Sequence, residues 1–110
     1  MGNSAKAIAK AALCAALLSC AIATSATAQS ERRGETLARK WCASCHIVAP
    51  DQKTAPDSVP SFAGIARSSH LTQKRLASFL LNQHPMMPGV VLSRREALDL
   101  AAYIKSKERR

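Results

Sequence analysis

Apolar and polar residues recur at a helical period along much of the chain. The stretch 32–43 contains no proline, and Leu37, Ala38 and Trp41 recur at the spacing of one helix face. We therefore expect a helix over 32–43 that runs into the segment holding Cys42 and Cys45. The stretch 47–60 differs, because it holds three prolines among polar residues, and it is predicted to be an irregular loop.

Two helices are predicted in the middle of the chain, each behind a residue that suits an N-cap. Ser61 precedes a short apolar turn that reaches Ala66, and Thr72 precedes a longer helix that ends before Pro85. The apolar face of the longer helix is expected to hold Leu76, Phe79 and Leu80.

The last predicted helix has the clearest start. Ser93 and Glu96 have the spacing of a capping box, in which each side chain binds the backbone amide of the other residue. Its apolar stripe is formed by Ala97, Leu100, Ala101 and Ile104. Four short helices, with no alternating strand pattern and no internal repeat, predict an all-α domain. A domain this small buries little apolar surface by itself, so a large apolar cofactor would complete its core.

The first 28 residues differ from the rest and are predicted to be a signal peptide. Lys6 and Lys10 provide a basic start without an acid, residues 11–23 are apolar except for one serine, and Ala26-Thr27-Ala28 suits signal peptidase. Cleavage would leave a functional domain over 29–110, exported to the periplasm. A membrane span is disfavoured, because the apolar run is shorter than the roughly 20 residues that a bilayer requires. The alternative that stays open is a lipoprotein, since the sequence before Cys20 resembles a lipobox.

The exported domain would be basic. The signal peptide removes two lysines and no acid, which leaves 14 basic and seven acidic residues and a formal charge of +7. This charge predicts attraction to acidic partner proteins. Nucleic acid is disfavoured, because the domain's aromatic residues form no stacking series among the basic ones. The aromatic residues are Trp41, Phe62, Phe79 and Tyr103.

The two cysteines of the exported domain lie in the segment Cys42-Ala43-Ser44-Cys45-His46. A disulfide between them would close a very short loop and would constrain the unfolded chain little. A zinc site is disfavoured, because His70 and His84 lack the paired spacing usual with a CxxC knuckle, and a thioredoxin-type dithiol requires a βαβ setting. CxxCH is the attachment signature of c-type haem, with both thiols bonded to the haem and His46 bound to the iron.

A second axial ligand would let the iron cycle electrons without binding a substrate. The segment after the third predicted helix offers three candidates, namely His84, Met86 and Met87. A thioether favours Fe(II) and raises the reduction potential, whereas a second imidazole would lower it. Prolines at 85 and 88 stiffen this segment, which favours a ligand held against the iron. If none of these side chains binds, the open iron would suit a haem enzyme or a sensor.

The chain resembles the class I c-type cytochromes over roughly residues 34–105. The motifs that carry the resemblance are Gly34, CASCH at 42–46, VPSFAGIA at 59–66, MP at 87–88 and LSxxExxDLxAYI at 92–104. The resemblance implies a small cytochrome c fold with one covalently attached haem c and outer-sphere electron transfer. It implies that Met87 is the distal iron ligand and that Pro60 offers its carbonyl to the ring of His46. It also implies that the first helix packs on the last, with Gly34 near Leu100 and Tyr103.

The chain departs from the family pattern at two places. Ala38 occupies a position that is usually aromatic, so Trp41 is the aromatic residue available for that space, and Val59 stands where glycine often precedes the proline. The resemblance favours a free periplasmic electron carrier over a dedicated subunit of a periplasmic dehydrogenase. Several basic residues are then expected to ring the haem edge and dock an acidic redox partner. These residues are Arg94 and Arg95, with Lys53, Lys74 or Arg75.

Overall fold

The N-terminal helix is longer upstream than predicted. The structure is a computed structural model that describes residues 6, 8, 25–56, 58–82 and 89–109. In it, residues 25–41 are helical, so the helix covers the predicted cleavage point after Ala28 and stops at Trp41 rather than at Ala43. Four successive turn residues follow. The CxxCH segment therefore lies in the turns beyond the helix, not in its last turn.

Three α-helices and a short 3-10 helix follow in the described part of the chain, which contains no β-strand. They are α2 (Phe62–Ala66), α3 (Gln73–Leu81), α4 (Arg94–Ser106) and η1 (Lys107–Arg109). The predicted N-caps are confirmed, because the side chains of Ser61, Thr72 and Ser93 each accept a hydrogen bond from the backbone amide three residues later. The Glu96 side chain completes the capping box of α4. The fold is all-α, as predicted.

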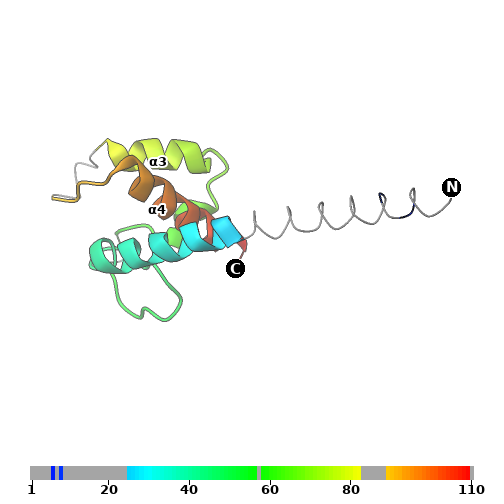
Figure 1. Cartoon of the computed structure of the whole chain (residues 1–110). Helices are drawn as coiled ribbons and strands as arrows, with labels where there is room; N and C mark the ends of the chain where they lie inside the picture. Colours follow the sequence, from blue (N-terminus) through cyan, green and yellow to red (C-terminus); the bar gives the residue numbers. More distant parts are fainter. Residues whose placement is uncertain (1–5, 7, 9–24, 57, 83–88, 110) are drawn as a thin grey trace.

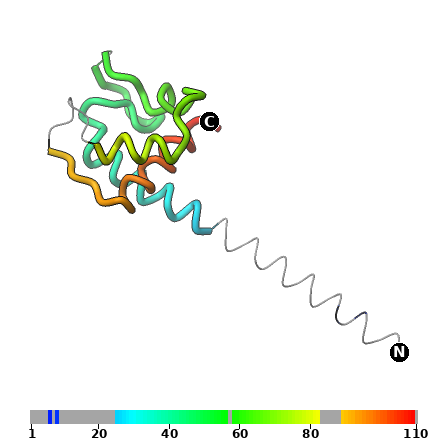
Figure 2. The backbone as a smooth tube through the Cα atoms, turned by 90° about the horizontal axis from the view of Figure 1, so that it is seen from above, coloured from blue at the N-terminus to red at the C-terminus, as the bar shows by residue number. Residues whose placement is uncertain are grey.

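The N-terminal helix crosses α4 (Figures 1 and 2), and Gly34 lies where the two helices touch. A Cβ atom on Gly34 would lie within contact distance of the Asp99 carbonyl and 2.7 Å from Cβ of Tyr103. Only a residue without a side chain allows the two helix backbones to approach this closely. The expected contact between Gly34 and Tyr103 is therefore confirmed. The residues of α4 that face Gly34 are Asp99 and Tyr103.

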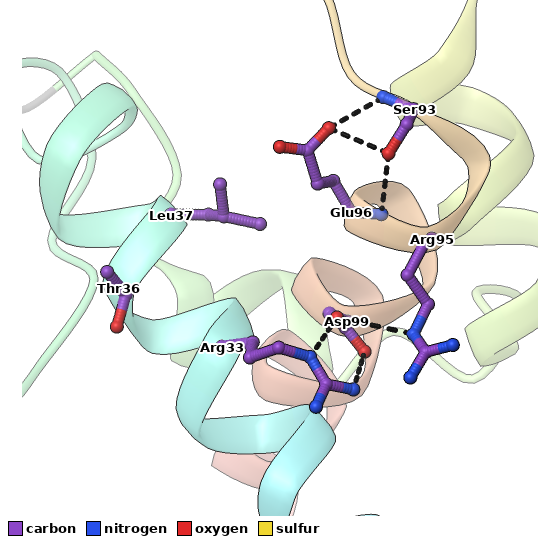
Figure 3. Close-up of a pocket in the computed structure, with 7 residues that line it drawn as sticks. All are labelled: Arg33, Thr36, Leu37, Ser93, Arg95, Glu96 and Asp99. Carbon is purple, nitrogen blue, oxygen red and sulfur yellow. Dashed lines mark hydrogen bonds and ion pairs between the residues drawn. The ribbon is translucent and has the colours of Figure 1, made fainter.

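A carboxylate on α4 fixes the same crossing (Figure 3). Asp99 is 3% exposed, and its oxygens accept hydrogen bonds from Nε of Arg33 at 2.6 Å and from Oγ of Ser30 at 2.5 Å. Nη2 of Arg33 donates a second hydrogen bond to the carboxylate at 3.0 Å, and Nε of Arg95 lies 3.8 Å from Oδ2 of Asp99. The charged and hydroxyl partners offset the cost of burying this carboxylate, and removing them would leave an unpaired buried charge that opposes folding.

The apolar core gathers around α4, which packs against both α3 and α2. Leu100 and Ile104 are 2% exposed, and Phe62 of α2 and Leu76 of α3 are each 3% exposed. The predicted apolar face of α3 is partly wrong, because Phe79 is 48% exposed while Ala77 is buried. Among the described residues, no helix has the length and apolar character needed to cross a membrane.

Candidate functional site

The CxxCH segment begins where the N-terminal helix ends. The amide of Cys42 donates to the carbonyl of Ala38 at 2.9 Å, and the amide of His46 donates to the carbonyl of Cys42 at 2.8 Å. These bonds keep the backbone close to helical geometry, in which residues three and four apart are neighbours on one face. The structure thus brings Cys42, Cys45 and His46 together within about one turn of chain.

The two thiols have different surroundings. Both cysteines are free, with Cys42 buried and Cys45 exposed to solvent. Burial raises the pKa of the Cys42 thiol to about 11, because a thiolate is poorly solvated there. Two free thiols three residues apart in one turn, followed directly by an imidazole, form a donor set that fits haem attached through two thioethers.

The ring of His46 is oriented by the loop that follows it. Its Nδ1 lies 2.6 Å from the carbonyl oxygen of Pro60. A carbonyl oxygen can only accept a hydrogen bond, so Nδ1 is the donor, and in the neutral ring this leaves the lone pair on Nε2. This tautomer is the one required for a ligand that binds metal through Nε2. The contact with Pro60 is confirmed, although Val59 replaces the glycine that often precedes this proline.

Aromatic rings connect the His46 ring to the core. The Phe62 ring lies 5.6 Å from the His46 ring and is tilted by 50° to it. Tyr103 on α4 meets Phe62 edge to face at 6.3 Å, and its hydroxyl donates to the Val48 carbonyl at 2.9 Å. The imidazole is therefore backed by side chains that are fixed by α2 and α4.

Trp41 does not occupy the space that the family pattern gives to an aromatic residue. Its side chain is 46% exposed, and the ammonium of Lys40 lies 4.8 Å from the centre of its ring. Ala38 is fully buried at the usual aromatic position. The expectation that Trp41 fills this space is wrong, because Trp41 is exposed at the last position of the helix while Ala38 is buried one turn earlier.

The second axial ligand is not tested by the structure. His84, Met86 and Met87 lie outside the described residues, as do the prolines beside them. The basic residues expected to dock a partner are described, and all of them are exposed. They are Lys53, Lys74, Arg75, Arg94 and Arg95.

One side chain at the site was not anticipated from the sequence. Gln52 lies in the irregular loop, and its amide group binds backbone atoms on both sides of Cys45. The sequence does not indicate this role of Gln52, because its partners are backbone carbonyl groups, which every residue has. Tyr103 was expected only at the helix crossing, and its bond to the Val48 carbonyl adds a second contact with the loop.

Comparison with known proteins finds a relative that covers most of the chain. The chain is 48% identical to cytochrome c-552 of Bradyrhizobium diazoefficiens over 94 residues, which is 86% of this chain and 90% of that protein. No family model matches the chain, and no solved structure gives a significant match. The match spans most of both chains. The chain therefore belongs to the class I c-type cytochromes.

Proposed function

We propose that the chain binds one haem c through thioethers from Cys42 and Cys45, with His46 as the proximal iron ligand, and that it carries single electrons. A c-type cytochrome is a haem-containing electron carrier, and these residues are the ones that fit the attachment. The observation that carries the assignment is the 2.6 Å contact between Nδ1 of His46 and the Pro60 carbonyl. It holds the imidazole in the tautomer that presents Nε2 to a metal.

The chain's own residues would prepare the site for electron transfer. When bound, the haem supplies an iron that alternates between Fe(II) and Fe(III). The Pro60 carbonyl fixes the ring of His46 and strengthens it as an electron donor. Phe62 and Tyr103 limit movement of that ring. Ligands that stay in place in both oxidation states reduce the rearrangement that each transfer requires.

Met87 is proposed as the distal ligand. This assignment rests on the family motif, in which a methionine directly precedes a proline, and on the stiffness that the flanking prolines give to the segment. A thioether favours Fe(II), so the reduction potential should lie above that of a bis-histidine haem.

The distal ligand can be tested by absorbance spectroscopy of the oxidised protein. An iron–methionine bond gives a weak band near the red end of the visible spectrum, and we expect Met87→Ala to abolish it. Met86→Ala is the matched control and should keep the band. Persistence of the band in Met87→Ala, or its loss in Met86→Ala alone, would contradict the assignment.

We also propose that residues 1–28 direct export to the periplasm, where residues 29–110 function. The basic start, the apolar run and the Ala26-Thr27-Ala28 segment support this. The intact mass of the protein from the periplasm should equal that of residues 29–110 plus one haem. A diacylglyceryl-sized addition on Cys20 would instead show a lipoprotein, and a mass without haem would contradict the proposed function.

A further inference from the structure

Gln52 binds the backbone of the CxxCH segment through the nitrogen of its side-chain amide and the loop after the segment through the amide oxygen. Its Nε2 donates to the carbonyl of His46 at 2.8 Å and to the carbonyl of Ala43 at 2.9 Å, and it lies 3.2 Å from the carbonyl of Thr54. Its Oε1 accepts a hydrogen bond from the amide of Val48 at 3.0 Å. One side chain thus contacts four backbone groups of the motif and of the loop after it.

These partners fix the orientation of the amide group. A side-chain amide has two hydrogens, and the two shorter bonds, to His46 and Ala43, use both of them. Turning the group over would place Oε1 against three carbonyl oxygens and would leave the Val48 amide facing a nitrogen that only donates. Only the observed orientation therefore satisfies the carbonyls of His46 and Ala43 together with the amide of Val48.

The carbonyls bound by Gln52 lie on either side of the second cysteine. Ala43 stands between the two cysteines and His46 follows Cys45, so the amide closes a link across Cys45. Val48, whose amide binds Gln52, is also anchored to the core, because the Tyr103 hydroxyl on α4 donates to its carbonyl. The backbone on both sides of Cys45 is thus connected to α4 through the side chains of Gln52 and Tyr103 and the backbone of Val48.

We propose that Gln52 is a positioning residue of the haem site. Its amide holds Cys45 and His46 in one relative geometry, so that the thioether and the imidazole meet the haem together and the ring keeps its hydrogen bond to Pro60. This inference rests on the proposed attachment of haem at these residues. It adds a residue outside the CxxCH motif that controls how strongly His46 donates to the iron.

Loss of the amide should therefore change the electronic properties of the haem. The hydrogen bond from Nδ1 of His46 to the Pro60 carbonyl makes the imidazole a stronger donor, which stabilises Fe(III). A ring released by loss of Gln52 would form this bond less completely. We expect the reduction potential to rise, because the oxidised state loses more stabilisation than the reduced state.

The test uses the full haem-loaded protein with Gln52→Leu, which keeps similar bulk without hydrogen bonds. Proton exchange in the reduced protein, followed by NMR, should accelerate roughly tenfold at the Val48 amide and at the His46 ring Nδ1–H. The reduction potential should rise in the same variant. The matched control is Gln73→Leu, since Gln73 is exposed at the first position of α3, far from the motif in sequence.

A second variant decides the matter if Gln52→Leu does not acquire haem. Gln52→Glu keeps the length and the acceptor for Val48, but its ionised carboxylate faces the carbonyls of Ala43 and His46 without a hydrogen to donate. We expect faster exchange of the His46 ring proton than in the parent at neutral pH. The difference should shrink in acid, where protonation restores one donor, and Gln73→Glu should show no such pH dependence.

The outcomes separate this inference from the proposed function. Parent-like ring exchange and potential in a haem-loaded Gln52 variant would overturn the positioning role and leave the electron carrier intact. A parent chain without covalently bound haem would overturn the proposed function itself. Faster exchange together with a raised potential, absent from the Gln73 controls, would support the role of Gln52.

Discussion

At the residue scale, the haem-attachment segment depends on contacts that reach it from outside the motif. The Pro60 carbonyl selects the tautomer of His46, and the Tyr103 hydroxyl anchors the loop after it at Val48. Neither partner is one of the motif's own residues. The haem chemistry of the CxxCH motif could be predicted from its five residues. The orientation of the His46 ring and of the loop after it could not, because residues distant in sequence set them.

Tyr103→Phe should destabilise the protein while keeping its ring packing. The substitution removes the hydroxyl that donates to the buried Val48 carbonyl, and an acceptor that loses its partner costs about 1–3 kcal/mol. The free energy of unfolding of the haem-loaded protein, measured with guanidinium chloride, checks this. An unchanged slope with denaturant would show that the unfolded state is unaffected. A variant as stable as the parent would contradict the anchoring contact.

At the element scale, the crossing between the N-terminal helix and α4 depends on close backbone approach. Gly34→Ala would place a Cβ atom 2.7 Å from Cβ of Tyr103, so the helices would have to separate. Alanine is the better helix former by about 1 kcal/mol, but overpacking costs about 1–3 kcal/mol or more. We expect net destabilisation in thermal unfolding.

Gly64→Ala is the matched control for this substitution. The nearest atom to its Cβ would be Oγ of Ser61 at 3.4 Å, which is an ordinary contact. This variant should be as stable as the parent or slightly more stable. If Gly34→Ala were equally well tolerated, the close crossing of the helices would be wrong.

Asp99 should make this helix crossing sensitive to acid. Hydrogen bonds from Arg33 lower the pKa of the Asp99 carboxyl below its usual range, burial opposes this, and Ser30 adds to the lowering. The contribution to stability is complete above about pH 5, where an unfolded aspartate is almost fully ionised. It is lost as the pH falls through the lower pKa of the folded state, because the unfolded chain binds the proton first.

The free energy of unfolding as a function of pH, in parent and Asp99→Asn, checks this expectation. The variant should be less stable at neutral pH by about 1–2 kcal/mol and should lose less stability in acid. Asp51→Asn is the control, because Asp51 pairs with Arg39 on the exposed surface and should contribute less. Identical acid sensitivity in Asp99→Asn and the parent would contradict the role of Asp99.

The elements that the sequence predicted well are those with local causes. Ser61, Thr72 and Ser93 mark helix starts because a cap involves only the next three residues. Phe79 and Trp41 were placed wrongly because helical spacing alone does not reveal which face meets the core. The role of Gln52 could not be predicted, since its partners are backbone atoms brought near it by the course of the loop.

At the scale of the whole molecule, the excess of basic residues is the feature that bears on partners. Residues 29–110 carry a formal charge of +7, and the basic residues singled out around the predicted haem edge are exposed. Charge of this kind accelerates the encounter with an acidic protein and is screened by salt. We propose that the physiological partners are acidic redox proteins.

The rate of electron transfer to an acidic redox protein should therefore fall as ionic strength rises. Stopped-flow measurements across a salt series check this, with an uncharged small-molecule oxidant as the control that should respond little. Reversal of charge at Lys74, an exposed residue of α3, should reduce the slope with salt. Rates that do not depend on salt would contradict docking through the basic surface.

We propose that the protein carries single electrons on one covalently attached haem whose iron has both axial positions occupied by protein ligands. A potentiometric titration of the purified protein, followed by its visible spectrum, tests it most directly. We expect one reversible one-electron transition, the iron–methionine band in the oxidised form, and no change of the reduced spectrum under carbon monoxide. A protein without a haem transition, or a reduced form that binds carbon monoxide, would contradict the claim.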